Sequence, residues 1–171
     1  SVLAGIALAS SGVIFQGIFR NPMADPYIIG VSAGASFGAT IGLIFASGIR
    51  LASISLVSLF AFAGALGVTF LVYSISRTKG RVSVLTLLLA GVAISAMLSS
   101  INSFILMFQS QDLARVVFWL MGSFTAASWQ QLAIIGPIII VLFIVAAFFM
   151  TELNIISLGD QRATQLGVNT D

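Results

Sequence analysis

Five stretches of this chain lack charged side chains, and each is about as long as a membrane-spanning helix. They cover residues 1–19, 26–49, 51–76, 82–111 and 116–151. A helix needs roughly 20 apolar residues to cross the hydrocarbon core of a bilayer. Charged residues make up only 7% of the chain, whereas soluble domains carry about 25%. The sequence therefore predicts an integral membrane protein.

The expected fold class is all-α, a polytopic bundle of about five transmembrane helices. A helix pairs its backbone polar groups internally, as lipid requires, and the short alternating segments of a transmembrane β-barrel do not occur. The bundle is predicted over residues 1–151, with spans near 1–19, 27–49, 52–76, 83–108 and 129–150. The last uncharged stretch is longer than one span, so we expect residues 116–128 to lie at the membrane interface beside Trp129. A cytoplasmic segment follows at residues 152–171.

The basic residues predict which side of the membrane each loop faces. With five alternating spans, five basic residues fall on one side and two, Arg50 and Arg115, on the other. Loops rich in Lys and Arg stay in the cytoplasm. The loops with Arg20 and with residues 77–81 are therefore predicted to be cytoplasmic, together with the C-terminal segment. The net charge of +2 is spread over these loops, and it indicates no nucleic-acid partner.

Several residue types that membrane proteins use for chemistry are missing from the sequence. The chain has no His and no Cys, so we expect it to bind no metal and no cofactor. The predicted spans hold no Asp, Glu, Lys or Arg, the groups on which proton- and sodium-coupled transporters usually depend. No Gly-x-x-x-x-Gly-Lys-Ser/Thr loop is present, so an ATP-driven function requires a separate ATPase. The alternative function is a secondary transporter or channel, whose charged intramembrane group is absent.

Small and amide side chains mark candidate faces of the spans. Glycine recurs every four residues from Gly30 to Gly42, which predicts a smooth ridge for close helix packing, with pore lining as the alternative. Polar groups within a span must face protein or water. For such groups a packed hydrogen bond and a translocation path are both open. The candidates for helix packing or for the translocation path are Gln16, Gly34, Ser95, Ser99 and Asn102.

A short polar loop separates the first two predicted spans. Asn21-Pro22 and Asp25-Pro26 each have the pattern of an N-cap followed by a proline at the first helical position, where the missing N–H costs nothing. Two helix starts four residues apart predict a tight, rigid re-entry into the second span. Asn21 and Pro22 are therefore further candidates for the path or for packing.

The segment after the last span has the pattern of a short helix. Ser157 and Asp160 match a capping box, and Gly167 suits the position after a helix end, which predicts a helix over residues 158–166. Leu158, Arg162 and Leu166 give this helix a mixed surface suited to a groove on another protein. The alternative is a solvated helix beside the membrane.

Four ordered blocks resemble the permease subunits of ATP-binding cassette (ABC) importers for ferric siderophores, haem and cobalamin. The first is residues 16–26 with the glycines that follow, and the second is residues 87–93, similar to the family's fifth helix. The third is residues 118–123 with Trp129, similar to the external turn before its sixth helix. The fourth is the family's coupling pattern, matched here by Leu158, Gly159, Asp160, Ala163, Leu166 and Gly167.

The resemblance implies a type II importer permease and covers helices two to six of its usual ten, with the coupling segment. Both ends are accordingly expected to be cut from a longer protein. In this family the coupling segment docks onto an ATPase subunit, which binds ATP and Mg. The implied partners are two such subunits, a second identical or similar permease subunit, an extracytoplasmic binding protein and the lipid of the plasma membrane. The implied cargo is an iron chelate, haem or a cobamide.

Overall fold

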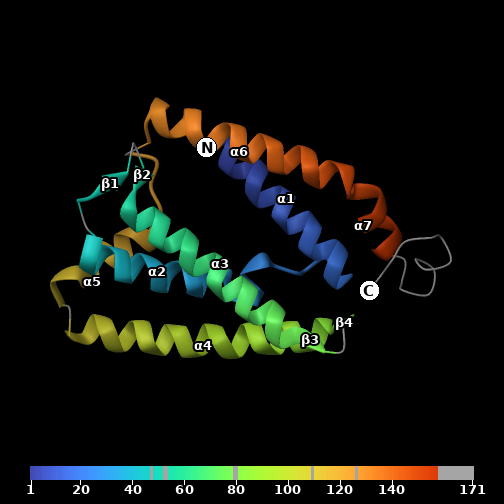
Figure 1. Cartoon of the computed structure of the whole chain (residues 1–171), viewed down its shortest axis with the longest axis horizontal. Helices are drawn as coiled ribbons and strands as arrows, with labels where there is room; N and C mark the ends of the chain where they lie inside the picture. Colours follow the sequence, from blue (N-terminus) through green and yellow to red (C-terminus); the bar gives the residue numbers. More distant parts are fainter. Residues whose placement is uncertain (47, 52–53, 79–80, 109, 126, 158–171) are drawn as a thin grey trace. The chain divides into compact units, whose positions relative to one another are not determined.

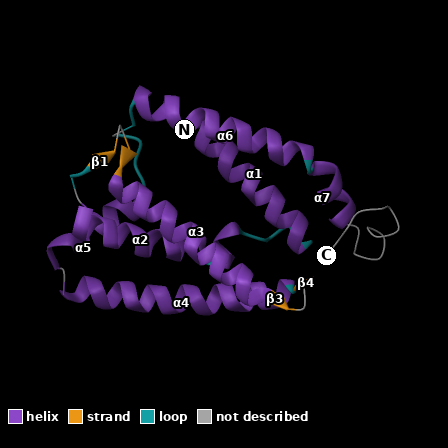
Figure 2. Cartoon of the chain, in the orientation of Figure 1, coloured by secondary structure: helices purple, strands orange, loops and turns teal. Residues whose placement is uncertain are grey.

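The computed structural model describes residues 1–46, 48–51, 54–78, 81–108, 110–125 and 127–157. Helices make up most of these residues, and the strands form short two-stranded ladders (Figure 2). The fold class is therefore all-α, as the sequence predicts. The chain divides into two compact units, one of Ser1–Pro26 with Ser128–Asp171 and the other of Tyr27–Ala127.

The first unit is built from three helices. α1 (Val2–Phe19) and α6 (Trp129–Phe148) lie side by side and run in the same direction, and α7 (Met150–Ser157) continues from α6 and contacts α1 (Figure 1). The predicted span over 129–150 thus ends two residues early, at a turn in which the N–H of Phe149 bonds to the carbonyls of Ala146 and Ala147. Neither glycine nor proline stands at this turn, so the sequence carries no signal for α7 as a separate helix.

The second unit holds the elements between residues 26 and 121. In chain order they are η1 (Pro26–Ile29), α2 (Val31–Ala46), β1 (Arg50–Leu51), β2 (Ile54–Ser55), α3 (Leu56–Ser76), β3 (Arg77–Thr78), β4 (Arg81–Val82), α4 (Val84–Phe108) and α5 (Ser110–Met121). Each strand pair is antiparallel, with Arg50 opposite Ser55 and Arg77 opposite Val82. The two ladders reverse the chain between α2 and α3 and between α3 and α4. Ala39, Val57 and Ala61 form the buried core between α2 and α3.

α2 is shorter than the predicted span over 27–49. Its 16 residues correspond to about 24 Å of helix, less than the roughly 30 Å of hydrocarbon in a bilayer. Gly30, with φ 85°, separates η1 from α2, and Gly48, with φ 86°, is left-handed beyond its other end. Backbone outside a helix is tolerated at membrane depth where protein buries it, and Ile29 of η1 is buried.

Four of the described helices, α1, α3, α4 and α6, are long and apolar enough to cross a membrane. Two helices that cross a bilayer in the same direction are separated in sequence by an odd number of crossings. The parallel course of α1 and α6 (Figure 1) therefore requires a third crossing besides α3 and α4, and α2 with η1 is the available segment. The parallel course of α1 and α6 supports the prediction of five crossings.

α5 begins six residues before the segment that the sequence predicts at the membrane interface, residues 116–128. It begins at Ser110 and ends at Met121, and Gly122 follows with a left-handed backbone of φ 70°. Val116 is fully buried, and Trp119, nearly one turn later, packs on the core cluster of α2 and α3. The sequence prediction was wrong about the start of this segment, because polar residues 110–112 belong to an amphipathic helix that packs on protein.

α6 begins with a reciprocal cap. The Ser128 hydroxyl accepts a hydrogen bond from the Gln131 N–H at 3.3 Å, and the Gln131 side-chain oxygen accepts one from the Ser128 N–H at 3.3 Å. This is the capping-box arrangement of a Ser-x-x-Gln sequence. It places the first helical residue at Trp129, where the sequence predicts the span to begin.

Candidate functional site

The loop after α1 forms a turn in place of the first predicted helix start. The Asn21 side-chain oxygen accepts from the Met23 N–H at 2.9 Å, and the Asn21 carbonyl accepts from the Ala24 N–H at 3.0 Å. Asn and Asp side chains favour such turns because they bond to their own backbone two residues on. Asn21 is therefore not a helix N-cap, and the exposed Pro22 lies within the turn. Only Asp25-Pro26 leads into a helical segment, the 3₁₀-helix η1.

Arg20 links this loop to α7. Its Nε donates a hydrogen bond of 2.8 Å to the carbonyl oxygen of Ile156. One turn back, a Cβ added at Gly17 would collide with the Cδ2 of Leu153, so the two helices approach closely there. No local sequence pattern predicts this contact, because the two residues lie 136 positions apart.

The glycine ridge of α2 packs on α3. A Cβ at Gly34 would lie 2.6 Å from the carbonyl oxygen of Gly64 and 2.7 Å from the Val68 side chain, and one at Gly38 would collide with the carbonyl of Phe60. The helices therefore meet backbone to backbone, as in other close contacts through small residues. This arrangement agrees with the packing interpretation of Gly34.

A second packed face lies on α4. A Cβ at Gly91 would run into the carbonyl of Ile28 and lie 2.7 Å from the Cα of Ile29, and one at Gly30 would lie 3.1 Å from the Ser95 hydroxyl. Asn102, on the same side of α4, is 9% exposed. This face therefore holds η1 and the start of α2 against α4.

Asn102 makes a defined contact with α2. Its Nδ2 donates to the Ser36 hydroxyl at 3.1 Å, while its Oδ1 is buried without a hydrogen-bond partner in the described part of the chain. An amide in this position supports the packed hydrogen bond, one of the two roles open from sequence. Ser36 lies two residues from both Gly34 and Gly38, off the glycine repeat, so the repeat does not predict it.

The other polar candidates do not join this face. Ser99 and Gln16 are exposed within their own units. Each residue turns an α-helix by about 100°. Ser99, eight residues after Gly91, therefore lies about 80° from it around α4. Asn102, eleven residues after Gly91, lies only about 20° from it. The candidates on α4 are therefore divided between a packed face, with Asn102, and an exposed face, with Ser99.

The Asn102–Ser36 contact is testable with a double-mutant cycle. We expect Asn102→Ala and Ser36→Ala to be coupled by about 0.5–1.5 kcal/mol in the free energy of unfolding, because each removes the same hydrogen bond. The measurement is thermal unfolding of the full-length protein in detergent. Asn102→Ala with Ser99→Ala is the control cycle, which we expect to be nearly additive. Additive losses for the Ser36 cycle, together with lost transport, would assign Asn102 to the path.

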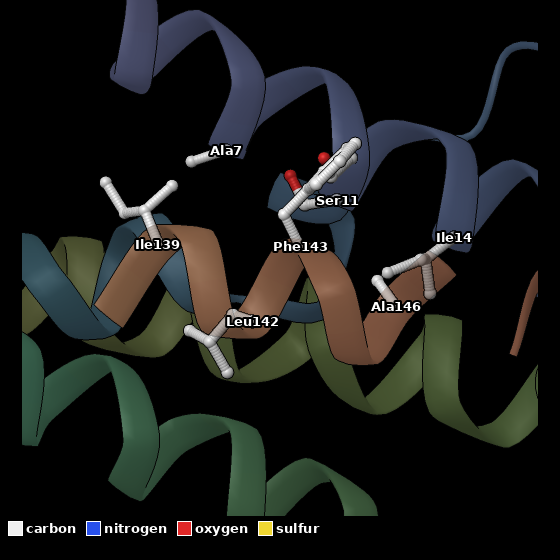
Figure 3. Close-up of a pocket in the computed structure, with 8 residues that line it drawn as sticks. Ala7, Ser11, Ile14, Ile139, Leu142, Phe143 and Ala146 are labelled. Carbon is white, nitrogen blue, oxygen red and sulfur yellow. The ribbon is translucent and has the colours of Figure 1, made fainter. Parts of the chain in front are cut away.

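α1 and α6 enclose a small apolar groove in the first unit. It has a volume of about 190 Å³, and Figure 3 shows Ser11 and Ile14 of α1 facing Phe143 and Ala146 of α6. The hydroxyls of Ser10 and Ser11 donate to the helix carbonyls of Ile6 and Leu8 at 2.7 and 2.9 Å. The polar groups at the groove are thus used within α1, and the groove offers mainly hydrocarbon contact.

The predicted coupling residues lie outside the described residues, which end at Ser157. They are Leu158, Gly159, Asp160, Arg162, Ala163, Leu166 and Gly167. Within the described residues no cluster of three or more His, Cys, Asp or Glu side chains could hold a metal ion. What the described residues bring together is a set of close helix contacts and the Arg20–Ile156 hydrogen bond.

The chain is similar over its whole length to known permeases. Residues 1–171 match the FecCD transport family. The cobalamin import system permease protein BtuC of Halobacterium salinarum is 37% identical over 98% of this chain and 44% of its own length. The hemin transport system permease protein HmuU of Yersinia pestis is 36% identical over 99% of this chain and 51% of its own length.

A solved structure shares the fold. It is described as an inward-facing conformation of a metal-chelate type ABC transporter, and it superposes with a TM-score of 0.82 and 31% identity over 98% of this chain and 53% of its own. This chain thus spans about half the length of the relatives that it matches. Because the family match covers all of its residues, the chain belongs to the FecCD transport family.

Proposed function

We propose that this chain is part of the permease subunit of an ATP-driven importer in the plasma membrane, and that the complete subunit moves an iron chelate, haem or cobalamin-type cargo into the cell. The observation that supports it most is the agreement of sequence and fold along the same residues. The FecCD transport family matches residues 1–171, and a metal-chelate type ABC transporter has the same fold over 98% of the chain.

The distribution of charge favours an external energy source. The long apolar helices contain no Asp, Glu, Lys or Arg between Val2 and Phe19, Leu56 and Ser76, Val84 and Phe108, or Trp129 and Phe148. A carrier coupled to protons or sodium needs groups there that change charge or bind the ion. In our proposal the work is done by two ATPase subunits that bind ATP and Mg and act on the cytoplasmic segment at residues 158–167.

The remaining parts of the proposed assembly follow from the family. A second identical or similar permease subunit completes the central path, and an extracytoplasmic binding protein delivers the cargo. The names of relatives include permeases for cobalamin, hemin and Fe(3+) dicitrate, which are large chelates or macrocycles. A gated path between helices of two subunits suits such cargo better than a narrow ion pore.

Uptake by the complete subunit tests this proposal. The full-length permease is reconstituted into vesicles with its ATPase and binding protein, and uptake of labelled ferric siderophore, haem and cobalamin is measured. We expect uptake of one cargo class only when ATP reaches the ATPase. The control is an ATPase whose P-loop lysine is replaced by alanine, which removes the group that holds the β- and γ-phosphates of ATP. Uptake driven by an ion gradient without ATP would contradict the proposal and favour a secondary transporter.

A further inference from the structure

We propose that Arg20 is a positioning residue for energy coupling, because it holds α7 on the end of α1 and so sets where residues 158–171 begin. This inference rests on the proposed function, in which that segment docks onto the ATPase. The contact consists of Gly17 and Arg20 from α1 and its C-cap, and of Leu153 and Ile156 from α7. We call it the α1–α7 contact.

The hydrogen bond from Arg20 suits the end of a helix. Ile156 is the second-last residue of α7, and the carbonyl groups of a last helical turn carry the negative end of the helix dipole. A guanidinium group is always charged, and its planar N–H groups point in fixed directions. The bond of 2.8 Å therefore fixes the angle at which α7 ends. The ammonium group of a lysine, on a flexible stem, would fix this angle less well.

A second contact on the same side attaches α7 to α1 at two points. Gly17 precedes Arg20 by three residues, and Leu153 precedes Ile156 by three residues. Residues three apart lie on one face of a helix, so the Leu153 side chain over Gly17 and the Arg20 hydrogen bond form a matched pair about one turn apart. One contact alone lets a helix pivot, whereas two at this spacing restrain its rotation.

The backbone of Arg20 gives an independent reason to assign a role to its side chain. Arg20 is the C-cap of α1, with φ 50° and ψ 38°, and its N–H bonds to the carbonyls of Gln16 and Gly17. It is the only non-glycine residue with positive φ in the described part of the chain. Glycine adopts this left-handed cap without strain. The left-handed backbone therefore does not explain why an arginine stands at this position. The α1–α7 contact gives its side chain a role.

The same conformation provides a clean test variant. Arg20→Gly removes the side chain and suits the left-handed backbone, so loss of the contact is separated from backbone strain. The matched control is Met23→Gly in the same turn, because the Met23 side chain is 84% exposed. Since the chain has no cysteine, spin labels can be placed at Val13→Cys on α1 and Thr151→Cys on α7. The distance between these labels is measured in the full-length protein assembled with its ATPase.

We expect a narrow distance distribution in the unsubstituted protein and with Met23→Gly, and a clearly broader one with Arg20→Gly. In vesicles, Arg20→Gly should lower cargo uptake per ATP hydrolysed about fivefold, the order expected for loss of one exposed hydrogen bond, while the ATPase still co-purifies. An unchanged distribution would overturn the positional role of Arg20. A broader distribution with normal uptake per ATP would overturn its role in coupling.

The test stays informative if a variant or the proposed function fails. Should Arg20→Gly not be recovered folded, Arg20→Met, which removes the charge and every side-chain hydrogen-bond donor, is measured in its place with the same expectations. If uptake in the unsubstituted protein proves independent of ATP, the proposed function fails, and the label distances alone still decide whether Arg20 positions α7.

Discussion

Replacing Gly34 by leucine is expected to prevent recovery of folded protein. The new side chain would begin 2.6 Å from the Gly64 carbonyl oxygen and 2.7 Å from Val68 Cγ2, and the nearer of these atoms belongs to backbone that cannot rotate away. Overpacking a core typically costs about 1–3 kcal/mol. We expect more here, because α2 and α3 must separate along their whole contact. The measurement is the yield of monodisperse full-length protein in detergent and its thermal unfolding temperature.

Gly67→Leu is the matched control for this prediction. Gly67 lies in α3 as well, and a Cβ there has no heavy atom within 4 Å, so the same substitution should leave yield and unfolding temperature nearly unchanged. The comparison separates packing from pore lining. A Gly34→Leu protein that is stable and assembled but inactive in transport would assign Gly34 to the path and contradict the packing interpretation.

The long helices could be predicted from the sequence, and the breaks between short ones could not. α1, α3, α4 and α6 follow from uncharged runs whose length only a spanning helix explains. The turn at Phe149 has no glycine or proline, and the strand ladders have two residues on each side. Such features depend on tertiary contacts, which composition and periodicity do not report. The start of α5 was missed for a related reason, because Val116 is fully buried and Trp119 packs on the core of α2 and α3.

Of the candidate site, the sequence predicted the helix contacts better than the polar ones. A four-residue glycine repeat has one physical explanation that dominates, close packing of helices, and Gly34 and Gly38 lie where it predicts. Asn102 was found as an amide that must face protein, but its partner Ser36 follows from the crossing of two helices. Arg20 was interpreted as a topology signal and as part of the block at residues 16–26, because its bond to Ile156 joins distant parts of the chain.

Replacing Leu158 and Leu166 together by alanine is expected to uncouple the permease from its ATPase. A segment that transmits force docks through a few side chains, and truncating such an anchor typically costs about 2 kcal/mol or more. Two anchors lost together would lower the affinity for the ATPase by roughly a thousandfold, since each 1.4 kcal/mol is a factor of ten. Insertion into the membrane should be normal, because no predicted span is changed. The measurements are recruitment of the ATPase to vesicles that contain the full-length permease, and cargo uptake.

Asp160→Ala is the matched control in the same segment. If Asp160 only caps the predicted helix over residues 158–166, its loss costs about 0.5–2 kcal/mol of local helix stability and should weaken recruitment far less than the double substitution. Equal effects would mean that the helix itself, and not its leucines, makes the interface. Normal uptake with both leucines replaced would remove this segment from the mechanism. The reasons to infer ATP-driven transport would then be family membership and the lack of charged residues in the long apolar helices.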